Sequence, residues 1–218
     1  VWISILKLLI PQKSKFIFNT WTAANIQENK FSTQNYISGT GYYKSINSFS
    51  SSIASFNGTK ASLEINNKHR LSAGIRYHYY YVKSLEKVRN SEYYAIRNEL
   101  FFSLDYDHKL FDFWILNFSI KEDIIDNNLY KPNFAIVSSW QITNNTSAYS
   151  AISQSLNHPS LNDLYYIPGG NPELKPEQAL SADIGLNLKI EDFILCKNRF
   201  NIYYRKINNL ILWRPGFQ

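Results

Sequence analysis

The clearest feature of this chain is a two-residue alternation of apolar and polar side chains. In residues 70–82, one set of alternate positions is apolar or aromatic: Leu71, Ala73, Ile75, Tyr77, Tyr79 and Tyr81. The other set is small or polar: Arg70, Ser72, Gly74, Arg76 and His78. The same pattern recurs in residues 94–106, 114–121 and 180–190. Because successive side chains of a strand point to opposite faces of a sheet, each run predicts a strand with one apolar and one polar face.

The length of these runs favours strands that cross a membrane. Most of them extend for about 10–13 residues, whereas strands of soluble sheets typically have about 5–6. A tilted strand needs about 9–11 residues to cross a bilayer, which agrees with the runs. No segment approaches the roughly 20 consecutive apolar residues of a transmembrane helix. The pattern therefore predicts an all-β chain, an antiparallel transmembrane β-barrel segment.

The connections between the predicted strands alternate between short and long. Short turns are expected at residues 66–68, 107–109 and 143–145. Longer segments are expected at residues 83–91, 122–132 and 154–177. Outer-membrane barrels have this asymmetry, with tight turns on the periplasmic side and long loops outside the cell. We therefore expect the segment 154–177 to be extracellular.

The first part of the chain has a weaker pattern. Residues 1–10 are largely apolar but no small-residue cleavage site follows, so they are predicted to be a strand or a buried edge rather than a signal peptide. Residues 15–24 and 36–44 resemble strands, and the serine-rich residues 45–55 are expected to form a strand with a small-residue face. With these, the chain has about ten or eleven predicted strands in one unit without a linker.

Composition agrees with a sheet that has one apolar face. Aromatic residues make up 16% of the 218 residues, and barrels gather such side chains near their strand ends. The net charge of +6 comes from scattered Lys and Arg, and the aromatic face is mostly free of charge. A nucleic-acid partner, which would need basic residues between exposed aromatics, is therefore not expected. The sequence contains no Met, which predicts a processed or truncated N-terminus, and its lone Cys196 allows no internal disulfide.

Residues with catalytic or metal-binding chemistry do not form a recognisable pattern. Gly39-Thr40-Gly41 is followed by no helical pattern, so it does not predict a phosphate cradle. The four histidines lack metal-ligand spacing, and Cys196 alone completes no zinc site. The adjacent carboxylates Glu122-Asp123 and Glu191-Asp192 are expected to be solvated turn charges. The sequence therefore predicts no catalytic, cofactor-binding or metal site, and no enzyme.

One segment carries a specific motif. Its first part consists of Pro159, Ser160, Asp163, Leu164 and Tyr165. Its second part consists of Gly170, Asn171, Pro172, Leu174, Pro176 and Glu177. The segment resembles the late barrel region of TonB-dependent outer-membrane receptors, where a Pro-Ser/Thr-x-x-Asp/Glu-Leu-Tyr run meets a Gly-Asn-Pro-x-Leu-x-Pro-Glu loop. His158 stands where that family often has Arg. Since prolines fix φ and glycines permit turns, we expect a stiff loop that serves barrel architecture rather than ligand binding.

The resemblance implies a larger protein and a function. Residues 1–218 would be part of a receptor barrel of about 22 strands, with the plug domain and the last strands absent from this chain. Such a receptor lies in the bacterial outer membrane, contacts its lipid, and takes up a scarce nutrient such as an iron-siderophore or cobalamin. The ligand binds at the extracellular face, and the TonB complex supplies energy through the plug. The resemblance identifies neither the ligand nor the substrate-binding residues.

Strand parity assigns residues to the two faces of the expected sheet. The predicted lumen-facing residues are Arg76, Arg97, Glu99, Asn117, Asp183 and Arg205. The predicted lipid-facing residues are Ala73, Ile75, Leu100, Leu104, Leu116, Leu186 and Leu188. Phe101 is the one large apolar residue expected on the polar face of its strand.

A second interpretation is a complete small outer-membrane barrel, acting as a pore or a barrel protease. It would require a continuous ladder between the first confident strand, near residues 16–21, and the last, residues 199–213. If the chain is instead part of a larger receptor barrel, it should form an open, curved antiparallel sheet with two unpaired edge strands.

Overall fold

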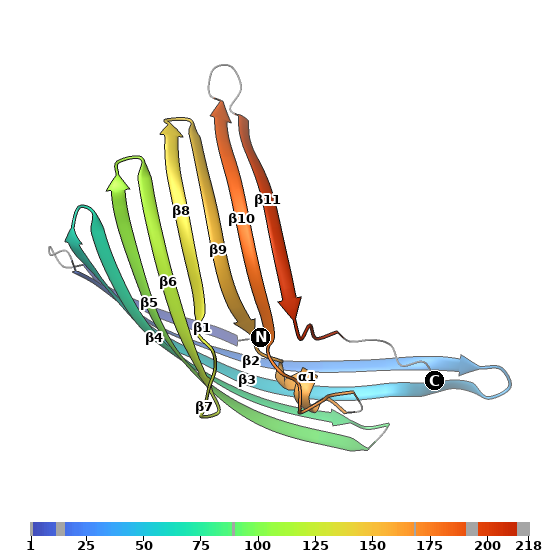
Figure 1. Ribbon diagram of the computed structural model, residues 1–218. Helices are drawn as coiled ribbons and strands as arrows, with labels where there is room; N and C mark the ends of the chain where they lie inside the picture. Colours follow the sequence, from blue (N-terminus) through green and yellow to red (C-terminus); the bar gives the residue numbers. More distant parts are fainter. Residues whose placement is uncertain (1, 12–15, 89, 168, 191–195, 213–218) are drawn as a thin grey trace.

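The computed structural model describes residues 2–11, 16–88, 90–167, 169–190 and 196–212 (Figure 1). The strands are β1 (Trp2–Pro11), β2 (Phe16–Ile37), β3 (Gly41–Asn66), β4 (His69–Glu86), β5 (Ser91–Phe111), β6 (Trp114–Ile125), β7 (Asn128–Leu129), β8 (Asn133–Thr143), β9 (Thr146–Asn157), β10 (Glu177–Ile190) and β11 (Cys196–Asn208). The single helix of the described residues is α1 (Leu161–Tyr165). No helix in these ranges is long and apolar enough to span a membrane.

All strands belong to one antiparallel sheet in which sequence neighbours pair. Its order is β1-β2-β3-β4-β5-β6-β8-β9-β10-β11, with the two-residue β7 paired to β6. Antiparallel neighbours need only short connections, which is why the two-residue turns suffice. Figure 1 shows these turns at one end of the strands, while α1 and the connections that flank it lie at the opposite end. The predicted all-β antiparallel architecture of about ten or eleven strands is confirmed.

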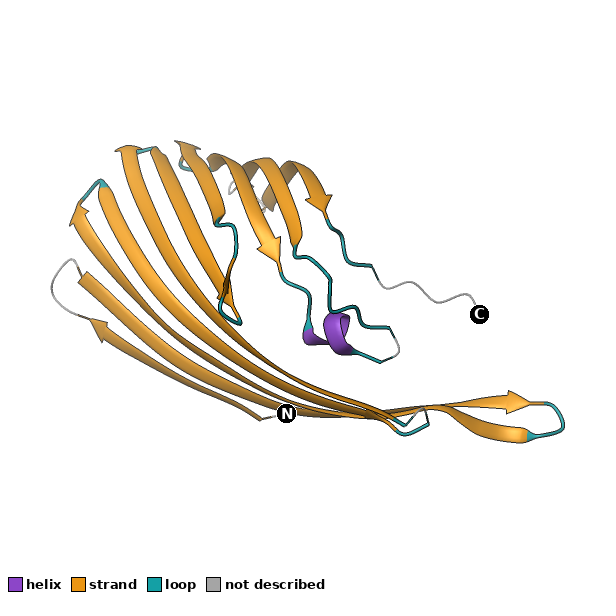
Figure 2. Cartoon of the chain, turned by 60° about the horizontal axis from the view of Figure 1, so that its bottom comes forward, coloured by secondary structure: helices purple, strands orange, loops and turns teal. Residues whose placement is uncertain are grey.

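The sheet is curved and open. Among the described residues β1 pairs only with β2, and β11 pairs only with β10, so no ladder joins the two ends. Figure 2 shows the strands bending around a concave face on which α1 lies. The predicted open sheet with two edge strands is therefore confirmed, and the described strands do not form the closed small barrel of the second interpretation.

The two faces of the sheet differ as the alternation predicts. The concave face holds the buried polar side chains Ser72, Ser84, Glu86, Arg97, Glu99, Asp123 and Ser181. The convex face exposes large apolar side chains, among them Ile75, Phe102, Leu104, Ile120, Ile136, Ile152 and Ile184. An apolar outer surface of this extent suits lipid and would favour aggregation in water.

Several predicted boundaries are wrong. The three long segments begin later than expected, because β4, β6 and β9 continue to Glu86, Ile125 and Asn157. The turn expected at residues 107–109 lies at Asp112 and Phe113, because β5 continues through the polar residues. Backbone pairing with β4 on one side and β6 on the other holds that extension in the sheet, and Arg70 of β4 adds an ion pair with Asp107, 2.6 Å from Nη2 to Oδ2.

The strand expected at residues 36–44 is instead a hairpin. β2 ends at Ile37 and β3 begins at Gly41. Gly39 and Gly41 have φ of 85° and 86°, conformations that glycine adopts without steric cost. The serine-rich residues 45–55 lie within β3, whose 26 residues far exceed the expected length.

Candidate functional site

The loop between β9 and β10 folds back over the concave face because its sequence encodes a capped helical turn. Ser160 is the N-cap of α1, and its Oγ accepts a hydrogen bond from the Asp163 amide at 3.1 Å. The Asp163 carboxylate accepts in return from the Ser160 amide at 2.8 Å. This reciprocal capping box satisfies two amide groups that a helix start leaves without partners. The first part of the sequence motif thus specifies the turn.

The second part of the motif closes the loop on itself. The Asn171 amide donates to the Asp163 carbonyl at 2.8 Å, and the Gly170 amide donates to the Tyr166 carbonyl. A Cβ atom on Gly170 would lie 2.6 Å from the Tyr166 backbone nitrogen, closer than real Cβ atoms come. At the end of the loop, Glu177 Oε2 accepts from Asn157 Nδ2 at 2.8 Å. These contacts fold the loop and tie its two ends together.

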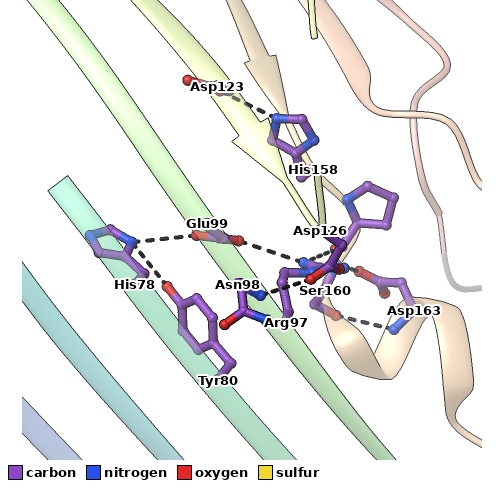
Figure 3. Close-up of polar contacts among 11 residues, drawn as sticks. His78, Tyr80, Arg97, Asn98, Glu99, Asp123, Asp126, His158, Ser160 and Asp163 are labelled. Carbon is purple, nitrogen blue, oxygen red and sulfur yellow. Dashed lines mark hydrogen bonds and ion pairs between the residues drawn. The ribbon is translucent and has the colours of Figure 1, made fainter. Parts of the chain in front are cut away.

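Three side-chain contacts hold this loop against the wall of the sheet, and Figure 3 shows those of Arg97 and His158. Arg97 Nη1 of β5 donates to the Pro159 carbonyl at 2.6 Å. The imidazole of His158 lies 3.2 Å from Asp123 Oδ2 of β6. The Tyr93 hydroxyl donates to Asn162 Oδ1. Since the partners come from three positions on two strands, the loop has a defined place on the concave face.

Asp123 differs from its sequence prediction. It was expected to be a solvated turn charge, but it is 1% exposed and lies between two bases. Lys121 Nζ is 3.1 Å from Asp123 Oδ1, and His158 approaches the other oxygen. Strand parity is the signal that separates the two carboxylates, because Asp123 shares the lumen face with Lys121 whereas Glu122 does not. The second carboxylate pair, Glu191-Asp192, lies outside the described residues.

The five charged residues predicted to face the lumen all lie on the concave face. Arg97 and Glu99 are 7% and 9% exposed, with 3.8 Å between Nη1 and Oε1. Glu99 also contacts His78 Nδ1 at 3.3 Å. The remaining three, Arg76, Asp183 and Arg205, lie elsewhere on that face. Only Arg97 and Glu99 are thus brought to the loop.

Phe101, the predicted exception, also lies on the concave face. It is 8% exposed, the Arg76 guanidinium lies 5.3 Å from its ring centroid, and the Lys121 ammonium lies 4.7 Å from it. A ring between two cations is a favourable cation–π arrangement, which accounts for an aromatic residue on an otherwise polar face.

A cavity of about 670 Å³ lies between the loop and the concave wall. Its wall is formed by the amides and hydroxyls of Asn25, Gln27, Asn29, Ser48, Ser50 and Ser52, on β2 and β3. Arg97, Glu99 and Tyr80 form its base, and Ser160, Asn162 and Tyr166 come from the loop. Sequence reasoning did not identify this site. The signal was the small-residue face of residues 45–55, which leaves room beside the wall.

The described residues contain no group of three or more His, Cys, Asp or Glu side chains that could hold a metal ion. Asp123 and His158 form a pair and the Lys121 ammonium occupies the space beside it. The contacts around the loop are hydrogen bonds and ion pairs that position it, and a polar cavity of this kind is suited to binding.

The fold and this site define a class: a segment of a β-barrel wall with a structured loop over its concave face. The family model "TonB dependent receptor-like, beta-barrel" matches residues 13–218. The chain therefore belongs to the β-barrel family of TonB-dependent receptors.

Individual relatives share either sequence or fold with the chain. It is 29% identical over 104 residues to a "Vitamin B12 transporter BtuB" of Photobacterium profundum, and 33% identical over 96 residues to that of Vibrio vulnificus. These regions are 47% and 44% of this chain, and 16% and 14% of the transporters. The ferric enterobactin receptor PfeA of Pseudomonas aeruginosa superposes with a TM-score of 0.68 at 12% identity, over 92% of this chain and 34% of the receptor. The chain thus spans about a third of that receptor's length, and its matched regions span 14–16% of the transporters.

Proposed function

We propose that this chain forms part of the wall of a bacterial outer-membrane receptor that imports a scarce nutrient, such as an iron-siderophore, cobalamin or a similar molecule. The observation that carries the proposal is the curved sheet with a polar concave and an apolar convex face, in a chain that matches the receptor barrel family over residues 13–218. The apolar face suits outer-membrane lipid, and the polar face suits a water-filled or plug-filled lumen.

The share of the relatives that the chain covers supports a proposal about the rest of the receptor. We propose that residues 1–218 form part of a barrel that has about 22 strands in all. Other segments of the receptor supply the plug and the remaining strands. The nutrient binds at the extracellular edge, where the loop 158–176 lies. The TonB complex acts through the plug and supplies the energy. Transport requires no catalytic residue, so the proposal includes no enzymatic activity, and it includes no nucleic-acid partner.

The proposal is tested by uptake through the full-length receptor that contains this chain. The receptor is expressed in a strain without its own siderophore and cobalamin receptors, with TonB intact or disrupted. We expect uptake of a labelled ferric siderophore or of cyanocobalamin, and its loss when TonB is disrupted. Flux of a small sugar is the control for passive leakage. Uptake that is unchanged without TonB would favour the pore interpretation instead.

A further inference from the structure

The cavity under the loop has an unusual wall. Six of its lining residues are uncharged hydrogen-bonding side chains at alternate positions of the concave face: Asn25, Gln27 and Asn29 of β2, and Ser48, Ser50 and Ser52 of β3. Ile53, Ala54 and Phe56 of β3 add apolar surface beside them. The strand register places Gln27 opposite Ser52 and Asn29 opposite Ser50. These two amides of β2 therefore each face a hydroxyl of β3. Amides and hydroxyls both donate and accept hydrogen bonds. Gln27 Nε2 donates to Asn29 Oδ1 at 3.1 Å, and the remaining donors and acceptors let the wall complement either kind of group.

The charged residues that line this cavity compensate each other. They are Arg97 and Glu99, which lie side by side and are both buried. Arg97 Nη1 also donates a hydrogen bond to the Pro159 carbonyl. Other ion pairs of the concave face, such as Lys60 with Asp105, lie outside the cavity lining. The cavity therefore has no net charge from its described residues.

Two buried polar atoms of the lining have no hydrogen-bond partner within the protein. They are Asn25 Oδ1, an acceptor, and Arg97 Nε, a donor. Buried polar atoms nearly always have a partner, so both atoms indicate where a bound molecule would place its own polar groups. Phe56, Tyr80 and Tyr166 add aromatic surface to the same cavity.

We propose that this cavity binds an electrically neutral ligand that is rich in amide and hydroxyl groups, and that it discriminates against polyanionic iron chelates. The inference rests on the proposed function and specifies its substrate class. A buried anion needs compensating cations, since its desolvation costs far more than neutral hydrogen bonds return. Here the one lining cation is already neutralised. A neutral amide-rich molecule exchanges its hydrogen bonds to water for those of the wall at little cost.

Equilibrium binding to the purified full-length receptor tests the charge preference. The neutral probes are cyanocobalamin, which carries many amides, and ferrichrome, a ferric trihydroxamate. The anionic probe is ferric enterobactin, a trianionic catecholate. We expect at least one neutral probe to bind about tenfold or more tightly than ferric enterobactin. A preference for ferric enterobactin, or binding of neither neutral probe, would overturn the inference.

Variants of the wall locate the binding. Asn25→Leu removes the amide and keeps the side-chain size, and it should weaken binding of the preferred neutral probe about tenfold. Asn19→Leu is the matched control, because Asn19 lies on the same face of β2 but does not line the cavity. Equal binding by the two variants would place the ligand elsewhere and overturn the inference.

Failure of the inference can be separated from failure of the proposed function. TonB-dependent uptake of ferric enterobactin in preference to the neutral probes would contradict the inference and leave the receptor function supported. Absence of TonB-dependent uptake for all three probes would count against both.

Discussion

At the scale of single residues, the contacts of greatest consequence join the loop to the wall. Asp123 is buried between Lys121 and His158, and removing one member of a buried ion pair leaves the others uncompensated. His158 is also the position where the sequence departs from the arginine often found in the family. The guanidinium of an arginine there can donate to the same carboxylate.

We therefore expect His158→Ala to loosen the loop 158–176 and His158→Arg to preserve it. Removal of a hydrogen bond to a buried charged group costs about 1.5–3 kcal/mol, which would raise local amide exchange roughly tenfold to a hundredfold. Hydrogen exchange of the full-length receptor measures this directly. Equal protection of the loop in wild type and His158→Ala would show that the ion pair does not anchor it.

Gly170 gives a second residue-scale prediction. A methyl group there would collide with the backbone at Tyr166 and Leu164, and backbone cannot move aside as a flexible side chain can. Gly170→Ala should destabilise the loop by about 1–3 kcal/mol without unfolding the strands. Limited proteolysis at Leu164 and Tyr165 reports the change, and Glu173→Ala, an exposed position of the same loop, is the control. Resistance equal to that control would contradict the tight fit.

At the scale of the strands, adjacent residues lie on opposite faces of the sheet, one on the apolar convex face and the next on the polar concave face. Ile152 of β9 is 55% exposed on the convex face, whereas its neighbour Ala151 faces the lumen opposite Asp183. Ile152→Arg should cost about 2–4 kcal/mol of folding free energy if the residue lies near the middle of the bilayer. Ala151→Arg should be tolerated, because the new charge meets water and a carboxylate. Folding into lipid vesicles, followed by urea titration, compares the two, and an equal loss would refute the face assignment.

Most of the strands and their two faces could be predicted from the sequence, and the exceptions have physical reasons. Alternation identified the faces of β4, β5, β6 and β10, because one side of each strand must suit lipid. It misplaced the β5–β6 turn, since a polar run such as residues 107–109 indicates a turn only when no cross-strand partners hold it. It also missed the cavity, because the loop and β2–β3 meet through contacts between residues far apart in the sequence.

At the scale of the whole molecule, the chain is an open wall with one lipid-facing and one lumen-facing surface. Short turns lie at one end of the strands, and the structured loop with α1 lies at the other end (Figure 1). In a receptor of the family, the two ends of the strands would face opposite sides of the outer membrane. Every function proposed for the loop and its cavity depends on that orientation.

Cysteine labelling in whole cells tests this orientation most directly. In a full-length receptor with Cys196→Ser, one cysteine is introduced either at Glu173 in the loop or at Asn144 in the β8–β9 turn, both exposed positions. A membrane-impermeant maleimide should label Glu173→Cys in intact cells, and should label Asn144→Cys only after the outer membrane is opened. Labelling of Asn144→Cys in intact cells with protection of Glu173→Cys would contradict the proposed receptor topology.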